Sequence, residues 1–279
     1  MVRRLCNNNG LFHAFGWSGN KGAGMLLRRI TKHVKDQNWF AVGIDFVIVV
    51  IGVGVALAAG EWMSARALKS DLKSAEVNIH AELYSNYLNA LERLAVKDCH
   101  GRQIREVADQ LKDTEKPWMP LEPFPARTGM AGALGSVLRT PYRGAWQTRA
   151  WQAASDGNLL IHMDPERRNA LSDAFSISET IGGYQDSIFT KQSELKALMI
   201  ATELSATDRL RYYDTLAEID AASALIEVGS EALISIVENL DVSLNHEFEQ
   251  QFLDDLASRN KAGFEVYGDC FVTMTLSDK

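Results

Sequence analysis

The sequence has few of the residues that build catalytic or metal-binding sites. It contains three cysteines and six histidines in 279 residues, and no His-Glu-x-x-His, Gly-x-Ser-x-Gly or Walker phosphate-loop motif occurs. Glu76 and His80 lie four residues apart, which is at most half of a metal site, because the second Glu-x-x-His pair of a di-iron bundle is missing. His100, His162 and His246 are scattered, and core or surface roles are favoured for them. We therefore expect neither an enzyme nor a bound cofactor or metal.

Positive charge is scarce after residue 60. Seven of the 29 Lys and Arg residues, but only two of the 36 Asp and Glu residues, precede residue 61, so the remainder carries 22 bases and 34 acids. The resulting net charge of −12 over residues 61–279 excludes the basic footprint that nucleic-acid binding requires. A basic start followed by an acidic remainder is also the asymmetry on which the positive-inside rule rests.

Long apolar runs are missing, with one exception. Residues 40–60, FAVGIDFVIVVIGVGVALAAG, are apolar or small apart from Asp45, and Trp39 and Trp62 flank them. A helix of about 20 residues spans a hydrocarbon core of roughly 30 Å, and tryptophans favour both membrane interfaces. The run predicts a single transmembrane helix in a bacterial inner membrane, with a cytoplasmic N-terminus and a periplasmic C-terminal domain. A cleaved signal peptide is less favoured, because the run is too long and begins too late.

Proline is concentrated in one segment, and its rarity elsewhere favours helices. Four of the six prolines lie in residues 116–128. Proline lacks the amide donor that a helix needs, so we expect this segment to be a loop or an extended strap. Trp118, Leu121 and Phe124 are expected to hold it against the helices.

These patterns divide the chain into four regions. Residues 1–24 have no periodicity and are either a disordered tail or a segment that precedes a true start at Met25. Residues 25–39 form a short basic cytoplasmic lead-in. Residues 40–60 form the transmembrane helix, and residues 61–279 form an extracytoplasmic helical domain.

Apolar residues recur at steps of three and four after the transmembrane segment, which predicts an all-α bundle of five to seven helices. The first helix is expected to continue for about 35 residues beyond Trp62 and to bend at Cys99–Gly101. The tail from Gly263 onward is expected to hold one short strand. The later helices have capping or proline signals at their starts: near Pro141, at Asp164-Pro165, at Ser205 and at Ser230.

The cysteines allow one bridge within the C-terminal domain. On the predicted topology Cys99 and Cys270 lie in an oxidising compartment, whereas Cys6 lies in the N-terminal tail. We expect a disulfide between Cys99 and Cys270, which would close a loop of about 170 residues. Two buried free thiols or an intermolecular bridge are the alternatives.

The transmembrane segment itself carries two candidate features. Gly52, Gly54, Ala56 and Ala58 place small residues four apart, which lets two helices approach closely. A homodimer through this face is as favoured as the alternative that small residues are common in membrane helices. Asp45 lies about 8 Å inside the span; its carboxylate either reaches the headgroups near the helix start or serves a function.

The segment from Gln37 to Gly54, QNWFAVGIDFVIVVIGVG, resembles a family of bacterial single-pass inner-membrane proteins that carry a domain of unknown function. The anchor of that family has the pattern W-x-A-V-x-I-D-F-x-I-V-V-x-G-V. Its members usually have Asn-Trp-Asn after the span, where this chain has Gly60-Glu61-Trp62. The resemblance begins at Met25 and continues more loosely at Ala145-Trp146, Asn158–Ile161 and Asp164–Glu166. It implies the topology above and a place for Asp45 in the family pattern, and it implies no activity.

The sequence favours a membrane-tethered, extracytoplasmic helical module that acts through protein–protein interaction with an unknown envelope protein. One alternative is the small subunit of an ion-coupled or channel-type complex. The corresponding subunits of Tol-, Exb- and Mot-type motors also have a cytoplasmic N-terminus, one span and an intramembrane Asp, which Asp45 would supply. A second alternative is a ligand-sensing bundle that signals through a partner.

Overall fold

The computed structural model describes residues 39–121, 137–138, 145–240 and 246–276. The predicted tail (1–24) and most of the lead-in lie outside these ranges. The chain divides into two compact units, residues 1–66 and 67–279, and the second unit holds the helical bundle.

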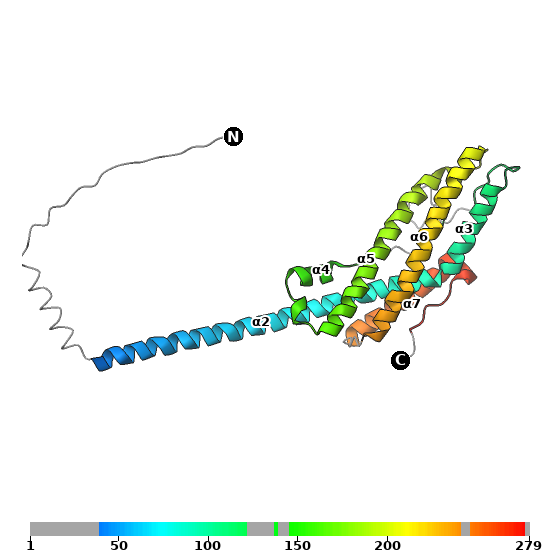
Figure 1. Cartoon of the computed structure of the whole chain (residues 1–279). Coiled ribbons are helices and arrows are strands. Elements are labelled where there is room, and N and C mark those ends of the chain that lie inside the picture. The colour runs from blue at the N-terminus through cyan, green and yellow to red at the C-terminus, as the bar shows by residue number, and fades with distance from the viewer. Residues whose placement is uncertain (1–38, 122–136, 139–144, 241–245, 277–279) are drawn as a thin grey trace, which may run out of the picture. The chain divides into compact units, whose positions relative to one another are not determined.

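The described chain is all-α, as expected, with six α-helices and three short 3-10 helices (Figure 1). The α-helices are α2 (Trp39–Ala95), α3 (Lys97–Lys112), α4 (Arg149–Asp156), α5 (Pro165–Glu194), α6 (Ala206–Asn239) and α7 (His246–Tyr267). The 3-10 helices are η1 (Leu160–His162), η2 (Leu195–Met199) and η3 (Gly268–Cys270).

Helix α2 runs without a break from the apolar run into the bundle, as predicted. Among the described residues it is the one helix long and apolar enough to cross a membrane, and its apolar stretch is not buried in the protein. Its second half is amphipathic instead, with Ile79, Leu83 and Tyr87 buried at steps of four. One helix therefore presents apolar residues all round in its first half and a single buried face in its second.

The bend after α2 lies earlier than the sequence suggested. It occurs at Val96, whose φ of −107° and ψ of 2° leave the helical region, and Cys99 falls in the first turn of α3. Val96 is fully buried, so the packing of this side chain, rather than Gly101, sets the position of the bend.

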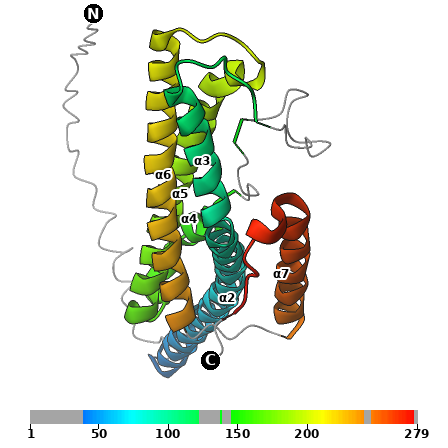
Figure 2. The same cartoon turned by 90° about the vertical axis from the view of Figure 1, so that its right-hand side faces the viewer.

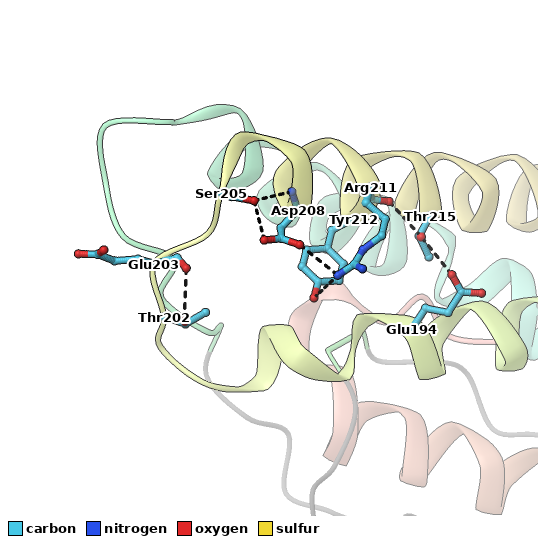
Figure 3. A network of polar contacts seen from close by, with 8 residues as sticks. All are labelled: Glu194, Thr202, Glu203, Ser205, Asp208, Arg211, Tyr212 and Thr215. Atoms are coloured by element: carbon cyan, nitrogen blue, oxygen red, sulfur yellow. Dashed lines mark hydrogen bonds and ion pairs between the residues drawn. The ribbon is translucent and has the colours of Figure 1, made fainter.

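The two longest helices of the bundle begin at the predicted caps. The Asp164 carboxylate accepts a hydrogen bond from the Arg167 amide at 2.9 Å, ahead of Pro165 at the first helical position. The Ser205 hydroxyl accepts from the Asp208 amide at 3.1 Å and donates to the Asp208 carboxylate at 2.6 Å (Figure 3). Both caps satisfy amide donors that the first turn of a helix leaves unpaired.

Three predicted boundaries are wrong for physical reasons. Pro141, where a helix start was expected, lies outside the described residues; residues 145–148 are not helical and α4 begins at Arg149, because the backbone of Gln147 pairs with the Asn86 side chain. Helix α6 does not restart at Ser230, which is buried inside one unbroken helix. The described tail to residue 276 contains no strand: Val272 donates to the Ala95 carbonyl, and the Met274 backbone pairs with the Asn260 side chain.

The core consists of two clusters. One joins the second half of α2 to α4, the first half of α5, the end of α6, α7 and the tail. The other joins α3, Trp118, the second half of α5, η2 and the first half of α6. Trp118 is buried as predicted, and its indole N–H donates to the Leu198 carbonyl at 2.8 Å. Figure 2 shows α5 and α6 on one side of α2 and α7 on the other, with α3 above.

Two glycines on the facing helices α5 and α6 predict opposite effects of an added methyl group. A Cβ at Gly229 would lie 2.9 Å from Ile181 Cγ1, whereas a Cβ at Gly183 would meet nothing within 4 Å. Gly183→Ala should therefore raise the free energy of unfolding by about 0.5–1 kcal/mol, the helix-propensity difference. Gly229→Ala should lower it by about 1–3 kcal/mol through overpacking. Urea unfolding of the full chain in detergent checks both values, and equal shifts in the two variants would contradict this packing.

Candidate binding site

A groove of 560 Å³ lies between the second half of α2, the start of α4 and α7. Its residues on α2 recur at steps of three and four, from Asn78 to Leu88, so they share one face over about 15 Å of helix. The lining residues are Asn78, Ala81, Glu82, Tyr84, Ser85, Leu88, Gln147, Arg149, Ala150, Gln251, Phe252, Asp255 and Arg259.

The α4 wall of the groove is fixed to α2 by side-chain contacts to its backbone. The Asn86 amide donates to the Gln147 carbonyl at 2.7 Å and accepts from the Gln147 N–H at 2.8 Å. The Glu82 carboxylate accepts from the Ala150 N–H at 2.7 Å. Glu82 thereby caps the first turn of α4, where a negative charge is favoured. An eight-residue helix with little stability of its own is held in place this way.

The α7 wall is attached to α2 by aromatic and ionic contacts. The rings of Phe252 and Tyr84 meet edge to face with centroids 4.9 Å apart, and Phe252 is buried. Further along, Arg259 Nη1 donates to Asn89 Oδ1 at 2.7 Å and to Glu92 Oε2 at 3.1 Å. The ion pair is largely shielded from water, so it positions α7 more firmly than a surface pair would.

The cysteines tie η3, which follows α7, to the first turn of α3. Cys99 and Cys270 lie at disulfide distance with Cα atoms 5.5 Å apart, as expected for the predicted bridge. Gly263 makes room for this return of the chain, because a Cβ there would overlap the ring of Phe271. The loop closed by the bridge contains α3 to α7.

The groove presents both signs of charge beside an aromatic floor. Arg149 and Asp255 are exposed on opposite walls, and Glu82 and Arg259 lie deeper. Burial raises the pKa of the Tyr84 phenol, and the charge of Glu249 raises it further. These groups donate and accept hydrogen bonds and offer apolar contact.

Two histidines, one on α2 and one on α3, have lowered pKa values. Burial lowers the pKa of His80 to about 4, and the positive charge of Arg167 adds to the effect; Arg167 Nη2 lies 2.8 Å from His80 Nε2. Burial lowers the pKa of His100 to about 3, with Arg93 nearby as the second cause. His80 is thus engaged by an arginine of α5. Across the described ranges no group of three His, Cys, Asp or Glu residues could hold a metal ion.

The predicted features of the apolar run all lie on exposed positions of α2. Asp45, Gly52, Gly54, Ala56 and Ala58 are exposed, and a Cβ at either glycine would meet no atom within 4 Å. Trp39 and Trp62 are exposed as well, and the Arg66 guanidinium lies 5.5 Å from the centre of the Trp62 ring. These side chains are available to lipid or to another helix.

Sequence reasoning missed the groove. Polar residues at 78, 82, 85 and 89 recur at helical spacing beside the apolar face of α2. This polar stripe is the sequence signal that could have indicated the groove. The spacing gives the face of α2 but not which helices cover its edges.

No protein-family model, curated protein or solved structure matches the chain.

The cysteine pair predicts a redox-dependent mobility. A bridge across 171 residues compacts the denatured chain, so the full chain should migrate faster on a non-reducing gel than on a reducing one. Cys99→Ser should abolish this difference and lower the free energy of unfolding, by at most about 5 kcal/mol in the chain-entropy model. Cys6→Ser is the control and should change neither property. Equal mobility with and without reductant would show that the thiols stay free in cells.

The neutral histidines predict loss of stability in acid. Both folded-state pKa values lie below the ordinary value of 6.5, so the unfolded chain binds protons first as the pH falls. The histidine contribution is therefore fully present above pH 6.5 and is lost as the pH falls toward 4. His80→Gln should reduce the slope of melting temperature against pH in this window, because it removes one of the two groups whose pKa is lowered by folding. Parallel slopes for the wild type and His80→Gln would refute the assignment.

Proposed function

We propose that this protein is a membrane-tethered helical module that binds a segment of another envelope protein in the groove between α2, α4 and α7. The groove is the observation that carries the proposal. It is long enough for several residues of a peptide, and it is built from elements that are fixed to one another by hydrogen bonds, an ion pair and a cysteine pair.

The chemistry of the groove favours a polypeptide over other ligands. An acyl chain favours an apolar pocket, and a nucleotide or nucleic acid needs positive potential, whereas here Arg149 and Arg259 are balanced by Glu82 and Asp255. A peptide carries amide donors and acceptors together with apolar side chains. Tyr84, which is partly exposed and packs on the buried Phe252, supplies aromatic contact of the kind that anchors such segments.

The sequence and helix α2 both support the proposed membrane tether, which is the first half of α2. Its apolar stretch is long enough to cross a membrane, and basic residues precede it while acidic residues follow it. The resemblance of residues 37–54 to a family of single-pass inner-membrane proteins agrees with this. On the proposed topology the groove faces the periplasm.

Photo-crosslinking from inside the groove tests the proposal. A benzophenone amino acid at Gln251, which is exposed and lines the groove, should give an adduct with a second protein in intact cells. Arg149→Glu reverses a charge on the wall, and we expect it to reduce the adduct at least tenfold. Arg102→Glu, an equally exposed arginine on α3, should leave it unchanged.

The control for the probe is the same amino acid at Asp173, exposed on α5 and outside the groove. Equal adducts at Asp173 and Gln251 would indicate collision with neighbours and would refute a groove-specific partner. An adduct at Gln251 that persists in Arg149→Glu would do the same.

Asp45 supports a second candidate function, an ion-coupled subunit, because it is the one ionisable residue in residues 40–60. An intramembrane acid of this kind is often functional. In that case Asp45→Asn should remove the partner adduct at Gln251 without changing the amount of protein in the membrane. An unchanged adduct favours the interaction module alone.

A further inference from the structure

Two exposed charges of the groove are available for a ligand. Arg149 on α4 and Asp255 on α7 line the groove, and neither forms a hydrogen bond or an ion pair with any residue that the structure describes. The other two charged groups are engaged. The Glu82 carboxylate accepts a backbone N–H of α4 at 2.7 Å, and Arg259 pairs with Glu92 at 3.1 Å. A bound segment therefore meets one positive and one negative charge that it can pair.

The level of Arg149 along the groove is set by its neighbours in the chain. The backbone of Gln147 is hydrogen-bonded to the Asn86 side chain, and the Ala150 N–H donates to the Glu82 carboxylate. Helix α4 therefore begins between these two residues of α2, and the positive charge lies at that level.

The level of Asp255 follows from the contacts of α7. Phe252 packs on Tyr84 with ring centroids 4.9 Å apart, and Arg259 pairs with Glu92 at 3.1 Å. Helix α7 therefore runs beside α2 in the same direction (Figure 2), and Asp255 lies between these two contacts. The negative charge is thus about one helical turn, or roughly 5 Å, further along α2 than the positive charge.

The length of the groove limits the segment that can meet both charges. The groove residues on α2 extend over about 15 Å, and an extended chain advances about 3.3 Å per residue, so about five residues fit along them. Groups that pair with Arg149 and Asp255 at the same time must therefore lie close together in one sequence. Tyr84 is partly exposed on α2 between the two levels and offers an apolar surface.

We propose that the groove selects a segment with an acidic and a basic residue within about five positions of each other and an apolar side chain between them. The acid pairs with Arg149, the base pairs with Asp255, and the apolar side chain packs on Tyr84. A segment that desolvates either charge without pairing it loses affinity. This inference names the partner of the proposed function and rests on that function.

The positive charge of Arg149 distinguishes this segment from the basic one that the domain as a whole would attract. Residues 61–279 carry a net charge of −12, and an acidic surface draws in basic ligands without regard to their sequence. A wholly basic segment would place like charge against Arg149 in the groove. A segment of mixed charge pairs both walls instead, so the groove favours it.

Selection from a random peptide library tests the inference. Phage-displayed linear peptides are selected on the full chain in detergent, with the detergent-coated resin as background. We expect the enriched sequences to share an acid and a base at one fixed spacing of about five positions or fewer. Enriched sequences that lack either charge would overturn the inference and leave the peptide groove standing. No enrichment over the resin would refute the proposed function itself.

Charge exchange then connects the selected peptide with the two walls. Arg149→Glu should weaken binding of the peptide at least tenfold, and replacing the acid of the peptide by lysine should restore binding to this variant. Asp255→Lys should respond in the same way when the base of the peptide is replaced by glutamate. The matched controls are Arg102→Glu, exposed on α3, and Asp173→Lys, exposed on α5, and they should leave binding unchanged. Equal losses in the controls, or losses without rescue, would overturn the proposed pairing.

Discussion

The burial of one face of α2 is the constraint on which the rest of the bundle depends. A 57-residue helix cannot fold back on itself, so its second half requires cover from other elements. Helices α4 to α7 and the C-terminal tail supply that cover around Ile79, Leu83 and Tyr87. Burying an aliphatic side chain of this size contributes roughly 1.5–3 kcal/mol. The first half has no such cover in the described chain, and a lipid environment is the cover that its composition favours.

The core around α2 includes polar groups that are either neutral or paired with another group. Arg93 is buried, and burial lowers the pKa of its guanidinium, an effect that Glu227 and Tyr267 oppose. The same positive charge helps to keep His100 neutral. Tyr87 donates to Glu238 at 3.1 Å, and burial together with that carboxylate raises the pKa of the phenol. Such groups make a core sensitive to substitution, because removal of one partner leaves the other buried and unpaired.

Sequence patterns predicted the features that depend on neighbours along the chain. The long apolar run, the caps at Asp164 and Ser205 and the burial of Trp118 all follow from local residue types. The features that depend on distant residues were missed: Val96 sets the bend because of core packing, and Asn86 holds Gln147 out of a helix across 61 positions. The groove falls in the second class, since its two outer walls meet α2 only in the folded chain. The sequence also offered no reason for a glycine at position 229. That reason is the close approach of Ile181 on α5, which is visible only in the folded chain.

In the proposed function, the groove would select among segments through its exposed charges. Arg149 and Asp255 are exposed on its walls, whereas Glu82 is engaged by the Ala150 N–H and Arg259 by Glu92. A segment that desolvates Arg149 or Asp255 without pairing it would lose affinity, so the proposed specificity depends on these two residues. Glu82 and Arg259 instead hold the walls to α2, so the groove is formed before a partner arrives, and this lowers the cost of binding.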